Sequence, residues 1–514
     1  MPAVVVAADA NTPEFEGKTT FYVILCAIIS AFGGFIFGFD NGISGGVTAM
    51  DDFLKEFFPK VYERKKTAHE DNYCKYDDQN LQLFTSSLYL AALVASFVAS
   101  KVCSRFGRRP TMQIASIMAV GGVGLTAGAV SIPILISGRI LLGFGVGFAN
   151  QAVPLFLSEL AHSKIRGSLN NLFQLFVTIG ILAANLVNYF CSNLHPNGWR
   201  VSLGIASVPA VILFFGSLAI PETPTSLIER QMLEQGKKTL KKIRGVENVD
   251  PEFDSIVHAS KRIGQVKAPF RKLLKPKNRP PLVIAILLQV FQQFTGINAI
   301  MFYSPVLFQT VGFKNDASLL SAVITGLVNV FSTLVAVFVV DRAGRRVLLL
   351  QASVQMFITQ TIIGAILMAK LSPTGTLKSS EAIIVVVLVC LFVMAFAWSW
   401  GPLGWLIPSE TFPLETRSAG FSCAVSTNMM FTFIIAQAFL SMLCKMRAGI
   451  FFFFGAWILV MGSFAFFLVP ETKGVSIDAM ADQVWNKHWY WKRYMVHDSE
   501  SESDDEESKS PRQS

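Results

Sequence analysis

Long apolar runs recur along the whole chain, separated by short polar segments. A helix needs about 20 mostly apolar residues to cross the hydrocarbon core of a bilayer, and the runs lack the strict alternation of a transmembrane barrel strand. The pattern therefore predicts an all-α membrane protein with twelve transmembrane helices. The predicted spans are residues 21–45, 81–101, 110–130, 132–155, 168–191, 199–220, 281–311, 317–340, 346–370, 382–407, 417–442 and 449–470.

The composition agrees with a chain that is solvated largely by lipid. Of the 514 residues, 52% are hydrophobic and 15% are charged, whereas about 25% of the residues of an ordinary soluble domain are charged. The net charge of +9 does not indicate a nucleic-acid partner, because the Lys and Arg residues stand in short clusters between apolar runs. The sequence shows no nucleophile–base pair, metal-ligand cluster or phosphate-binding loop, so we expect neither an enzyme nor a bound cofactor.

The positive charges also predict the orientation of the spans. The short loops on one side of the predicted bilayer carry ten Lys and Arg residues, and those on the other side carry four. Cytoplasmic loops are enriched in these residues. The richer side is therefore predicted to be cytoplasmic, and an even number of spans places both termini there.

Two longer polar segments divide the chain into regions. The predicted regions are a cytoplasmic N-terminus (1–17), a first six-helix half (18–220) with an extracellular cap loop (51–80), a cytoplasmic linker (221–279), a second six-helix half (280–470) and a cytoplasmic tail (471–514) that is acidic and disordered at its end.

Three motifs of the first half recur in the second half in the same order. They are Arg105-Phe-Gly-Arg-Arg109 with Arg342-Ala-Gly-Arg-Arg346, Glu159 and Arg166 with Glu410 and Arg417, and Pro221-Glu-Thr with Pro470-Glu-Thr. A repeat of this kind indicates two related six-helix halves around a site near the middle of the membrane, which is the architecture of a large class of transporters.

Asp40 is the only acidic residue within the first predicted span. An acid inside the membrane is a functional candidate by default, and burial favours its neutral form, which suits a reversible proton carrier. Arg139 opens the fourth span, and Gly143 and Gly147 give that helix a smooth face that another helix can approach. A pair of Asp40 with Arg139 would make protonation a switch, because Arg does not deprotonate. The alternatives are a static role for Asp40 and snorkelling of Arg139 to the outer surface.

One face of the fifth span carries a polar stripe. Gln174, Thr178, Ile181, Asn185 and Asn188 follow one another at helical spacing. Each amide offers both a donor and an acceptor, which suits a ligand rich in hydroxyl groups. The alternative is hydrogen bonding between helices, which Asn185 and Asn188 could provide.

The seventh span holds three amides, Gln292, Gln293 and Asn298, around Gly296. Two adjacent side chains do not face the same way on a regular helix, so we predict a break at Gly296 that lets the three converge. On the eighth span, Asn329 shares a face with other polar residues.

The tenth span places Trp398, Pro402, Trp405 and Ser409 on one face. An aromatic ring can stack on an apolar face of a ligand, and Pro402 is expected to hinge the helix beside Trp405. The alternative is a belt of Trp residues at the membrane interface.

Three strings of the sequence are similar to those of a known family. They are Leu83-Phe-Thr-Ser-Ser-Leu-Tyr-Leu90, Gln292-Gln-Phe-Thr-Gly-Ile-Asn298 and Trp398-Ser-Trp-Gly-Pro-Leu-Gly-Trp405. Through them the chain resembles plant-type sugar transport proteins, the proton/hexose symporters of the sugar porter family in the major facilitator superfamily. The resemblance runs from about residue 18 to about residue 495.

The resemblance implies the major facilitator fold and a plasma-membrane importer that moves a hexose such as glucose with a proton, by alternating access. Its partners would be a monosaccharide, protons as the coupling ion, and the lipid bilayer. It implies that Asp40, together with Arg139, carries the coupling. The predicted substrate-binding residues are Phe37, Gln174, Ile181, Gln292, Gln293, Asn298, Asn329, Gly401, Trp405 and Asn428.

The repeated charged motifs are expected to form ion pairs at helix ends and to lock the cytoplasmic face while the outer face is open. The alternative is that they only signal topology. Two departures could weaken this lock: Ser104 stands where the second repeat has Asp341, and His162 stands where relatives usually carry Pro. The predicted cytoplasmic gate consists of Arg105, Arg108, Glu159, Arg166, Asp341, Arg342, Arg345, Glu410 and Arg417.

Cys74 and Cys444 both lie on the predicted outer side, where disulfides persist. Cys191 is a competing partner by topology. The resemblance implies a bond between Cys74 and Cys444, which would join the cap loop to the second half.

Two further functions remain open from the sequence. An uncoupled hexose facilitator is one alternative, although facilitators of this family usually lack an acid at the position of Asp40. A transporter-like sugar sensor is the other, although sensors tend to have longer cytoplasmic tails than this chain.

Overall fold

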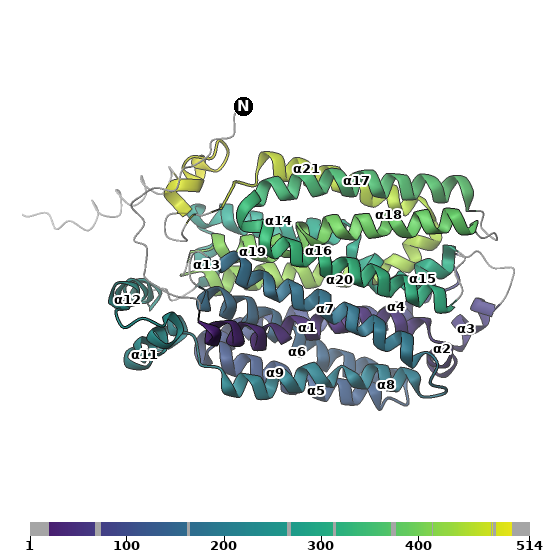
Figure 1. The fold of residues 1–514 in the computed structure, drawn as a ribbon, viewed down its shortest axis with the longest axis horizontal. Helices are drawn as coiled ribbons and strands as arrows, with labels where there is room; N and C mark the ends of the chain where they lie inside the picture. The colour runs from purple at the N-terminus through teal and green to yellow at the C-terminus, as the bar shows by residue number, and fades with distance from the viewer. Residues whose placement is uncertain are drawn as a thin grey trace, which may run out of the picture.

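The computed structural model describes residues 20–66, 73–161, 165–264, 269–311, 315–371, 377–413, 415–473, 475 and 480–495. In these residues the fold consists of helices joined by short loops. Figure 1 shows two layers of long helices, the first half of the chain below and the second half above. The small helices α2 and α3 lie at one end of the bundle, which we call the cap end, and α11 and α12 lie at the other, which we call the linker end.

Each half contributes six spanning segments. Those of the first half are α1 (Phe21–Ala49), α4 (Gln79–Phe106), α5 (Arg108–Ala127), α6 (Ile132–Leu160), α7 (Arg166–Cys191) and α8 (Gly198–Ile205) with α9 (Ser207–Ala219). Those of the second half are α14 (Arg279–Phe294) with α15 (Ile297–Val311), α16 (Asn315–Ala343), α17 (Arg345–Lys370), α18 (Ser379–Ala397) with α19 (Trp400–Thr411), α20 (Arg417–Met446) and α21 (Gly449–Phe467).

Short helices lie outside the spans. They are α2 (Asp51–Phe57) and α3 (Pro59–Lys66) at the cap end, α10 (Pro224–Glu229), α11 (Leu233–Arg244), α12 (Asp250–Gly264), α13 (Pro269–Leu273) and a 3-10 turn (Pro276–Asn278) between the halves, and a π-helical turn (Ala481–Trp485) after α21.

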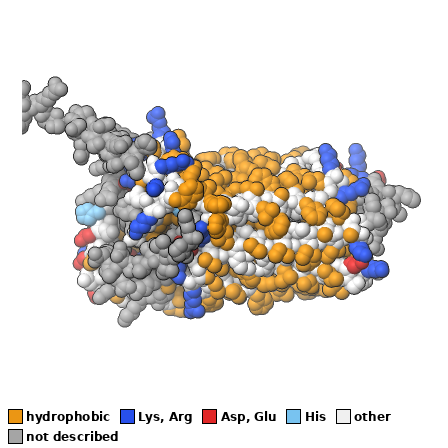
Figure 2. All heavy atoms as spheres, turned by 90° about the horizontal axis from the view of Figure 1, so that it is seen from above, with side chains coloured by type: hydrophobic (Ala, Val, Ile, Leu, Met, Phe, Trp, Pro, Cys, Tyr) orange, Lys and Arg blue, Asp and Glu red, His pale blue; other side chains and the backbone are white. Residues whose placement is uncertain are grey.

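Eleven helical segments of the described chain are long and apolar enough to cross a membrane. They correspond to eleven of the twelve predicted spans. The remaining one, predicted over 281–311, is divided into α14 and α15, each too short to count alone. Hydrophobic side chains cover the middle of the molecule, and Lys and Arg gather toward its two ends (Figure 2). This distribution matches the apolar belt and charged rims of a membrane-spanning protein.

Close helix contacts within the first half depend on glycine. A Cβ added to Gly143 of α6 would lie 2.2 Å from the carbonyl oxygen of Leu88, and one on Gly147 would lie 2.6 Å from that of Ala92. The predicted smooth face of the fourth span is therefore real, and the helix that approaches it is α4. A Cβ on Gly38 of α1 would meet the carbonyl oxygen of Val177 on α7 at 1.9 Å, so these two backbones are also in contact.

The two halves meet along α4 and α20 through a row of short polar side chains, which we call the hydroxyl seam. It is defined by Ser86, Ser96, Ser100 and Ser104 of α4 and by Ser418, Ser422, Ser426 and Gln437 of α20. Ser96 bonds Ser426 at 2.5 Å, Ser86 donates to Gln437 at 2.6 Å, and Ser100 lies 3.2 Å from Ser418. The seam thus runs from the cap end to the linker end.

Two spans of the second half are interrupted. The predicted break in the seventh span is present, because α14 ends at Phe294 and Gly296 has φ of +84°, a conformation that favours glycine. The tenth span is broken at Ser399, between α18 and α19. The expected hinge at Pro402 is therefore wrong by three residues: Pro402 lies in the first turn of α19, where its missing N–H is tolerated.

Candidate functional site

An ion pair lies inside the first half. Arg139 on α6 donates through Nη1 to Asp40 on α1, and both residues are buried, at 0% and 2% exposure. Arg139 also donates through Nη2 to Ser44 Oγ and through Nε to the carbonyl oxygen of Phe84 at 3.1 Å. The hydroxyl of Tyr89 donates to Asn41 Oδ1 at 2.6 Å beside this pair. The structure thus brings together the two charges singled out from the sequence.

Several contacts hold this pair in place. Asp40 and Ser44 are four residues apart and therefore share a face of α1. The guanidinium carbon of Arg139 lies 4.4 Å from the centroid of the Phe84 ring. Removing either partner of such a buried pair lowers stability strongly, because the remaining charge would stay buried without a partner. Arg139 is thus directed into the protein rather than to the outer surface.

The second half carries a cluster of amides around the break in the seventh span. Asn298 of α15 donates to Gln293 Oε1 of α14, and also reaches Thr432 Oγ1 of α20 at 3.5 Å. Gln292 lies on another side, where it accepts from Asn428 of α20 at 2.7 Å. The break therefore turns Gln293 and Asn298 toward each other, while Gln292 joins them only through α20.

The amide of Gln292 also holds the interrupted tenth span. Its Nε2 donates to the carbonyl oxygens of Trp400 and Gly401 at 2.9 and 3.1 Å. Gln289, one turn earlier, donates to the carbonyl oxygen of Gly404 and accepts from Asn428 at 2.6 Å. Pro408 lies inside α19 and has no N–H to bond the carbonyl oxygen of Gly404, so Gln289 supplies the donor that this carbonyl lacks. Both glutamines thus bind backbone carbonyls in the first turns of α19.

The two halves touch where α7 and α19 cross. The ring of Trp405 packs edge-on against Phe173 of α7, with centroids 5.7 Å apart. A Cβ added to Gly401 would lie 3.3 Å from Nε2 of Gln174, so Gln174 lies directly against α19. Both Trp405 and Gln174 are buried. This crossing brings a polar residue of the first half next to the amide cluster of the second.

The remaining predicted substrate residues are buried but lie apart from these contacts. Phe37, Ile181 and Asn329 lie on α1, α7 and α16, and Oδ1 of Asn329 has no hydrogen-bond partner among the described residues. Asn185 donates to the carbonyl oxygen of Ala322 at 3.1 Å, and Asn188 donates to that of Gly42 at 3.1 Å. Asn185 and Asn188 thus form hydrogen bonds between helices, which was the alternative to ligand binding for the polar stripe of the fifth span.

Trp398 does not belong to this site. Because the helix is broken at Ser399, Trp398 and Trp405 do not lie on one continuous helix face. The indole N–H of Trp398 donates to Oε1 of Gln351 on α17 at 2.9 Å. Ser409 remains inward, where it accepts from Asn170 of α7 at 2.7 Å. The single face expected for the tenth span is thus split in two.

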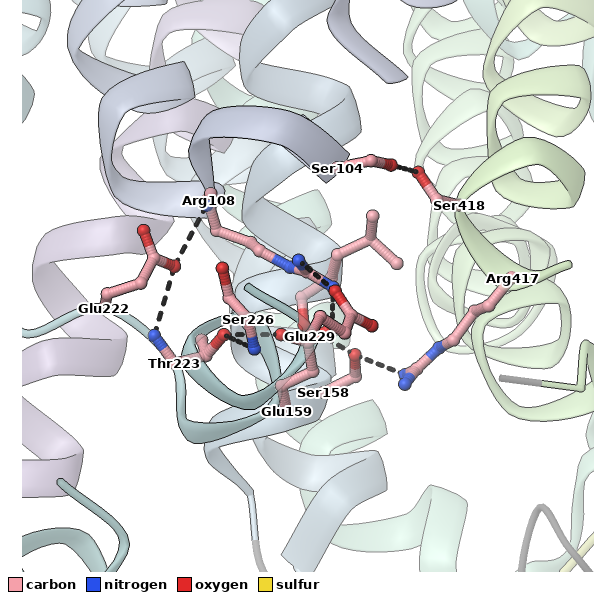
Figure 3. A network of polar contacts seen from close by, with 12 residues as sticks. Ser104, Arg108, Ser158, Glu159, Glu222, Thr223, Ser226, Glu229, Arg417 and Ser418 are labelled. Atoms are coloured by element: carbon pink, nitrogen blue, oxygen red, sulfur yellow. Dashed lines mark hydrogen bonds and ion pairs between the residues drawn. The ribbon is translucent and has the colours of Figure 1, made fainter. Parts of the chain in front are cut away.

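A charged network lies at the linker end of the first half (Figure 3). Arg108 binds Glu159 at 2.6 Å and Glu229 at 2.9 Å. The carboxylate of Glu222 accepts from the backbone N–H groups of Arg108 and Arg109 at 3.0 and 3.1 Å, at the start of α5. Burial raises the pKa of Glu222, against the opposing effect of Arg108 and of these N–H donors.

The second half repeats this network. Arg345 binds Glu410 at 3.2 Å, and Glu471 accepts from the backbone N–H groups of Arg345 and Arg346 at 3.0 and 3.1 Å. The pairs of Arg108 with Glu159 and of Arg345 with Glu410 each join helices of one half and do not link the two halves. A direct link between the halves comes from Arg417, which donates to Ser158 Oγ at 2.5 Å.

Other predicted gate residues differ in their surroundings. Arg105 and Arg342 are exposed, and the side chains of Arg166 and Asp341, together with His162, lie outside the described residues. Ser104, which stands where the second repeat has Asp341, contacts Ser418 at 3.3 Å in the hydroxyl seam. A cavity of about 420 Å³ opens here. It is lined by residues that include Lys101, Arg105, Arg108, Glu159, Glu415 and Arg417.

The cap end is closed by a covalent bond. Cys74 and Cys444 form a disulfide that joins the segment before α4 to the end of α20, whereas Cys191 is free and buried. Ser441 donates to Asp77 Oδ1 at 2.6 Å beside it. The pairing implied by the family resemblance is confirmed.

Comparison with known proteins agrees with this architecture. A family model described as sugar (and other) transporter matches residues 26–484. The chain belongs to this family. It is 69% identical over 498 residues to Sugar transport protein 8 of Arabidopsis thaliana, which covers 97% of this chain and 98% of that protein. It is also 69% identical over 492 residues to Sugar transport protein 6 of the same plant, with 96% and 97% covered.

The fold of this transporter is also that of a solved structure. The proton:xylose symporter XylE bound to 6-bromo-6-deoxy-D-glucose matches with a TM-score of 0.77 at 24% identity, over 90% of this chain and 98% of that one. The predicted major facilitator fold and family are therefore confirmed. The relatives are named as transport proteins, which agrees with the expectation that the chain is not an enzyme.

Sequence reasoning missed several residues of the transporter's site. Gln289 stands three residues before Gln292, so helical spacing could have placed it on the same face. Glu222 and Glu471 were noticed only as parts of a repeat, although an acid near a helix start is a common partner of its free N–H groups. Phe84 stands in one of the family strings, but nothing in the sequence paired it with Arg139, because that contact joins residues far apart in the chain.

Proposed function

We propose that this transporter imports monosaccharides, hexoses such as glucose, together with protons by alternating access. The observation that carries the proposal is the buried pair of Asp40 and Arg139 in the first half, beside a second half whose centre is lined with amides. The names of the similar proteins support it, since they include sugar transport proteins and a proton:xylose symporter.

The proton binds Asp40. In the charged state Asp40 is held by Arg139, and a proton removes that attraction. Arg139 keeps two neutral acceptors, Ser44 Oγ and the carbonyl oxygen of Phe84. The guanidinium is therefore still hydrogen-bonded when the acid is neutral, which reduces the free energy that protonation requires. Loss of the ionic tie between α1 and α6 frees α1 to change its position.

The sugar binds the amides of Gln174, Gln292, Gln293, Asn298, Asn329 and Asn428. Its hydroxyl groups replace bonds that these side chains now make with one another, since each amide both donates and accepts. Trp405 stacks on the pyranose from α19, and Gly401 leaves room for Gln174 beside it. Phe37 and Ile181 supply apolar contacts from the first half.

The orientation follows from charge and redox chemistry. The linker end carries the Arg-rich motifs and is assigned to the cytoplasm, with both termini there. The cap end carries the Cys74–Cys444 disulfide and is assigned to the outside, where such bonds persist. Opening at the linker end requires the halves to part at Arg417 and Ser158, while the ion pairs within each half stay intact. The plasma membrane is the proposed location.

Uptake of labelled glucose into transport-deficient cells tests the proposal. Wild-type protein should accumulate sugar above equilibrium at acidic external pH and lose this ability with a protonophore. Asp40→Asn should equilibrate sugar without accumulating it. Accumulation by the Asn variant contradicts the role of Asp40. Uptake that never exceeds equilibrium indicates a facilitator, and surface-expressed protein without any uptake indicates a sensor.

A further inference from the structure

A row of aromatic rings runs from the cap to the proposed proton pair. Phe53 of α2 packs against Phe84 of α4 with ring centroids 5.1 Å apart, and against Trp199 of α8 at 5.6 Å. Phe53 and Phe84 are both fully buried. The cap helix α2 is therefore docked on the spans by an apolar contact between Phe53 and Phe84.

Phe84 in turn contacts Arg139 twice. The guanidinium lies over its ring at 4.4 Å from the centroid, and its carbonyl oxygen accepts from Nε at 3.1 Å. The electron-rich face of an aromatic ring attracts a cation, most strongly where water is excluded. One side of the guanidinium is thus fixed by Phe84, and Asp40 and Ser44 bind its other nitrogen atoms.

The three acidic residues of α2 are engaged elsewhere. Asp51 binds Lys65 at 2.8 Å, Asp52 binds both His195 at 2.5 Å and Lys55 at 3.4 Å, and Glu56 binds Arg200 at 2.7 Å, with Arg200 lying over the Trp199 ring. From the spans, Tyr89 of α4 faces Asp40, and Tyr303 of α15 lies near Tyr89. Within the described chain, α2 is therefore linked to Arg139 by the aromatic contacts of Phe53 and Phe84, and not by an ion pair.

We propose that Phe84 is a positioning residue that transmits docking of the cap to the orientation of Arg139, and so sets how readily Asp40 takes up a proton. This inference rests on the proposed function of the pair. With Phe84 in place, the guanidinium is held toward the carboxylate and favours its charged form. Without the ring, the guanidinium of Arg139 is held less firmly toward Asp40. Asp40 is then protonated at a higher pH than in the wild-type protein.

Three matched substitutions test this role. Phe84→Leu removes the ring but keeps the carbonyl acceptor. Phe53→Leu removes the cap ring that contacts both Phe84 and Trp199, and Phe57→Leu removes a ring of the same cap helix that contacts Trp199. Phe57 packs against Trp199 at 5.3 Å, and none of its ring contacts within the described chain is with Phe84. All three remove a buried ring, so a purely structural effect would be similar in each.

The measurement is the pH profile of glucose uptake, with KM taken at saturating acidity. For Phe84→Leu we expect the half-maximal pH to move upward by about half to one pH unit, with KM at acidic pH unchanged. Phe53→Leu should shift it less in the same direction, and Phe57→Leu should match wild type. If Phe84→Leu does not reach the membrane, Phe53→Leu against Phe57→Leu decides the question.

Equal shifts in all three variants, or no shift in Phe84→Leu, overturn the proposal. A shift of Phe53→Leu toward acidic pH also overturns it, because the Phe53 contact would then act by excluding water and not by orienting Arg139. Asp40→Asn separates this result from the proposed function. If Asp40→Asn loses accumulation while Phe84→Leu keeps the wild-type profile, only the inference about Phe84 fails. If Asp40→Asn still accumulates sugar, the proposed function itself fails.

Discussion

At the linker end, the two halves of the transporter build the same network from matching residues. In each case, an acid just after the last span of the half accepts from two backbone N–H groups at the start of an earlier span: Glu222 follows the first half and Glu471 follows the second. The preceding glycines, Gly107 and Gly344, have φ of +102° and +92°. The duplicated sequence motifs therefore preserve a duplicated support for helix starts.

Within their first spans the halves differ. The first span, α1, runs unbroken over Phe21–Ala49 and carries Asp40, whereas its counterpart in the second half is interrupted at Gly296 and carries amides. The first half thus provides the charged pair, and all of the amides proposed to bind the sugar except Gln174 lie in the second half. The two halves share one fold but are proposed to serve different roles. Substitutions at the charged pair should therefore alter proton coupling and not sugar affinity, and substitutions at the amides of the second half should do the reverse.

The strongest way to break this division is Arg139→Leu. Asp40 would remain buried without its partner, which typically costs about 3–5 kcal/mol. We expect a large loss of thermal stability in detergent at neutral pH, a smaller loss at acidic pH where Asp40 is neutralised, and no accumulation of sugar.

The matched control is the double variant Asp40→Asn with Arg139→Leu. It removes both charges, so it should recover much of the stability but none of the accumulation. A double variant as unstable as Arg139→Leu alone would show that the ion pair is not what holds this region.

The second largest effect is expected in the other half. Gln293→Ala and Asn298→Ala should each weaken glucose binding by about 1–3 kcal/mol, or roughly 5- to 150-fold, because partners lose their hydrogen bonds. The two losses should not add, since these side chains bond each other. Binding of labelled glucose and the pH profile of uptake are the measurements. A shifted pH profile would contradict the division between the halves.

The break in the seventh span can be tested by Gly296→Ala. Its φ of +84° disfavours any side chain, and an added Cβ would lie 2.8 Å from Phe454. We expect about 1–2 kcal/mol of lost stability and weaker sugar binding, measured by thermal unfolding with and without glucose. Gly204→Ala is the control, because its Cβ would meet nothing closer than 3.9 Å. Equal effects of both changes would show that the break is not required.

The smallest effect concerns the cap. Cys74→Ala removes the bond to Cys444, which should admit water to the Asp40 region and favour the charged acid. The half-maximal pH of uptake should then move toward acid by about half a unit, with sugar affinity at saturating acidity retained. Cys191→Ala, a change at a free buried thiol, should leave the profile unchanged. An unchanged profile in Cys74→Ala would indicate that the bond does not protect the proton pair.

The sequence predicted most of the fold because apolar length and repeated motifs are direct signals of spans and halves. It also identified Asp40 and Arg139, since charges inside spans are rare enough to stand out. It misplaced the break in the tenth span, because Pro402 is an obvious helix breaker and Ser399 is not. It gave no hint that Arg108 and Arg345 bind acids of their own half, since ion-pair partners depend on helix packing.

The hydroxyl seam between α4 and α20 has a kinetic consequence. Each of its bonds, such as Ser96 with Ser426, joins neutral groups and contributes only about 1 kcal/mol, because water can replace either partner. The halves therefore separate at one end through a succession of small barriers instead of one large one. Removing a single hydroxyl should therefore change the rate of turnover very little. The seam can open and close repeatedly without trapping the transporter in the outward-open or the inward-open state.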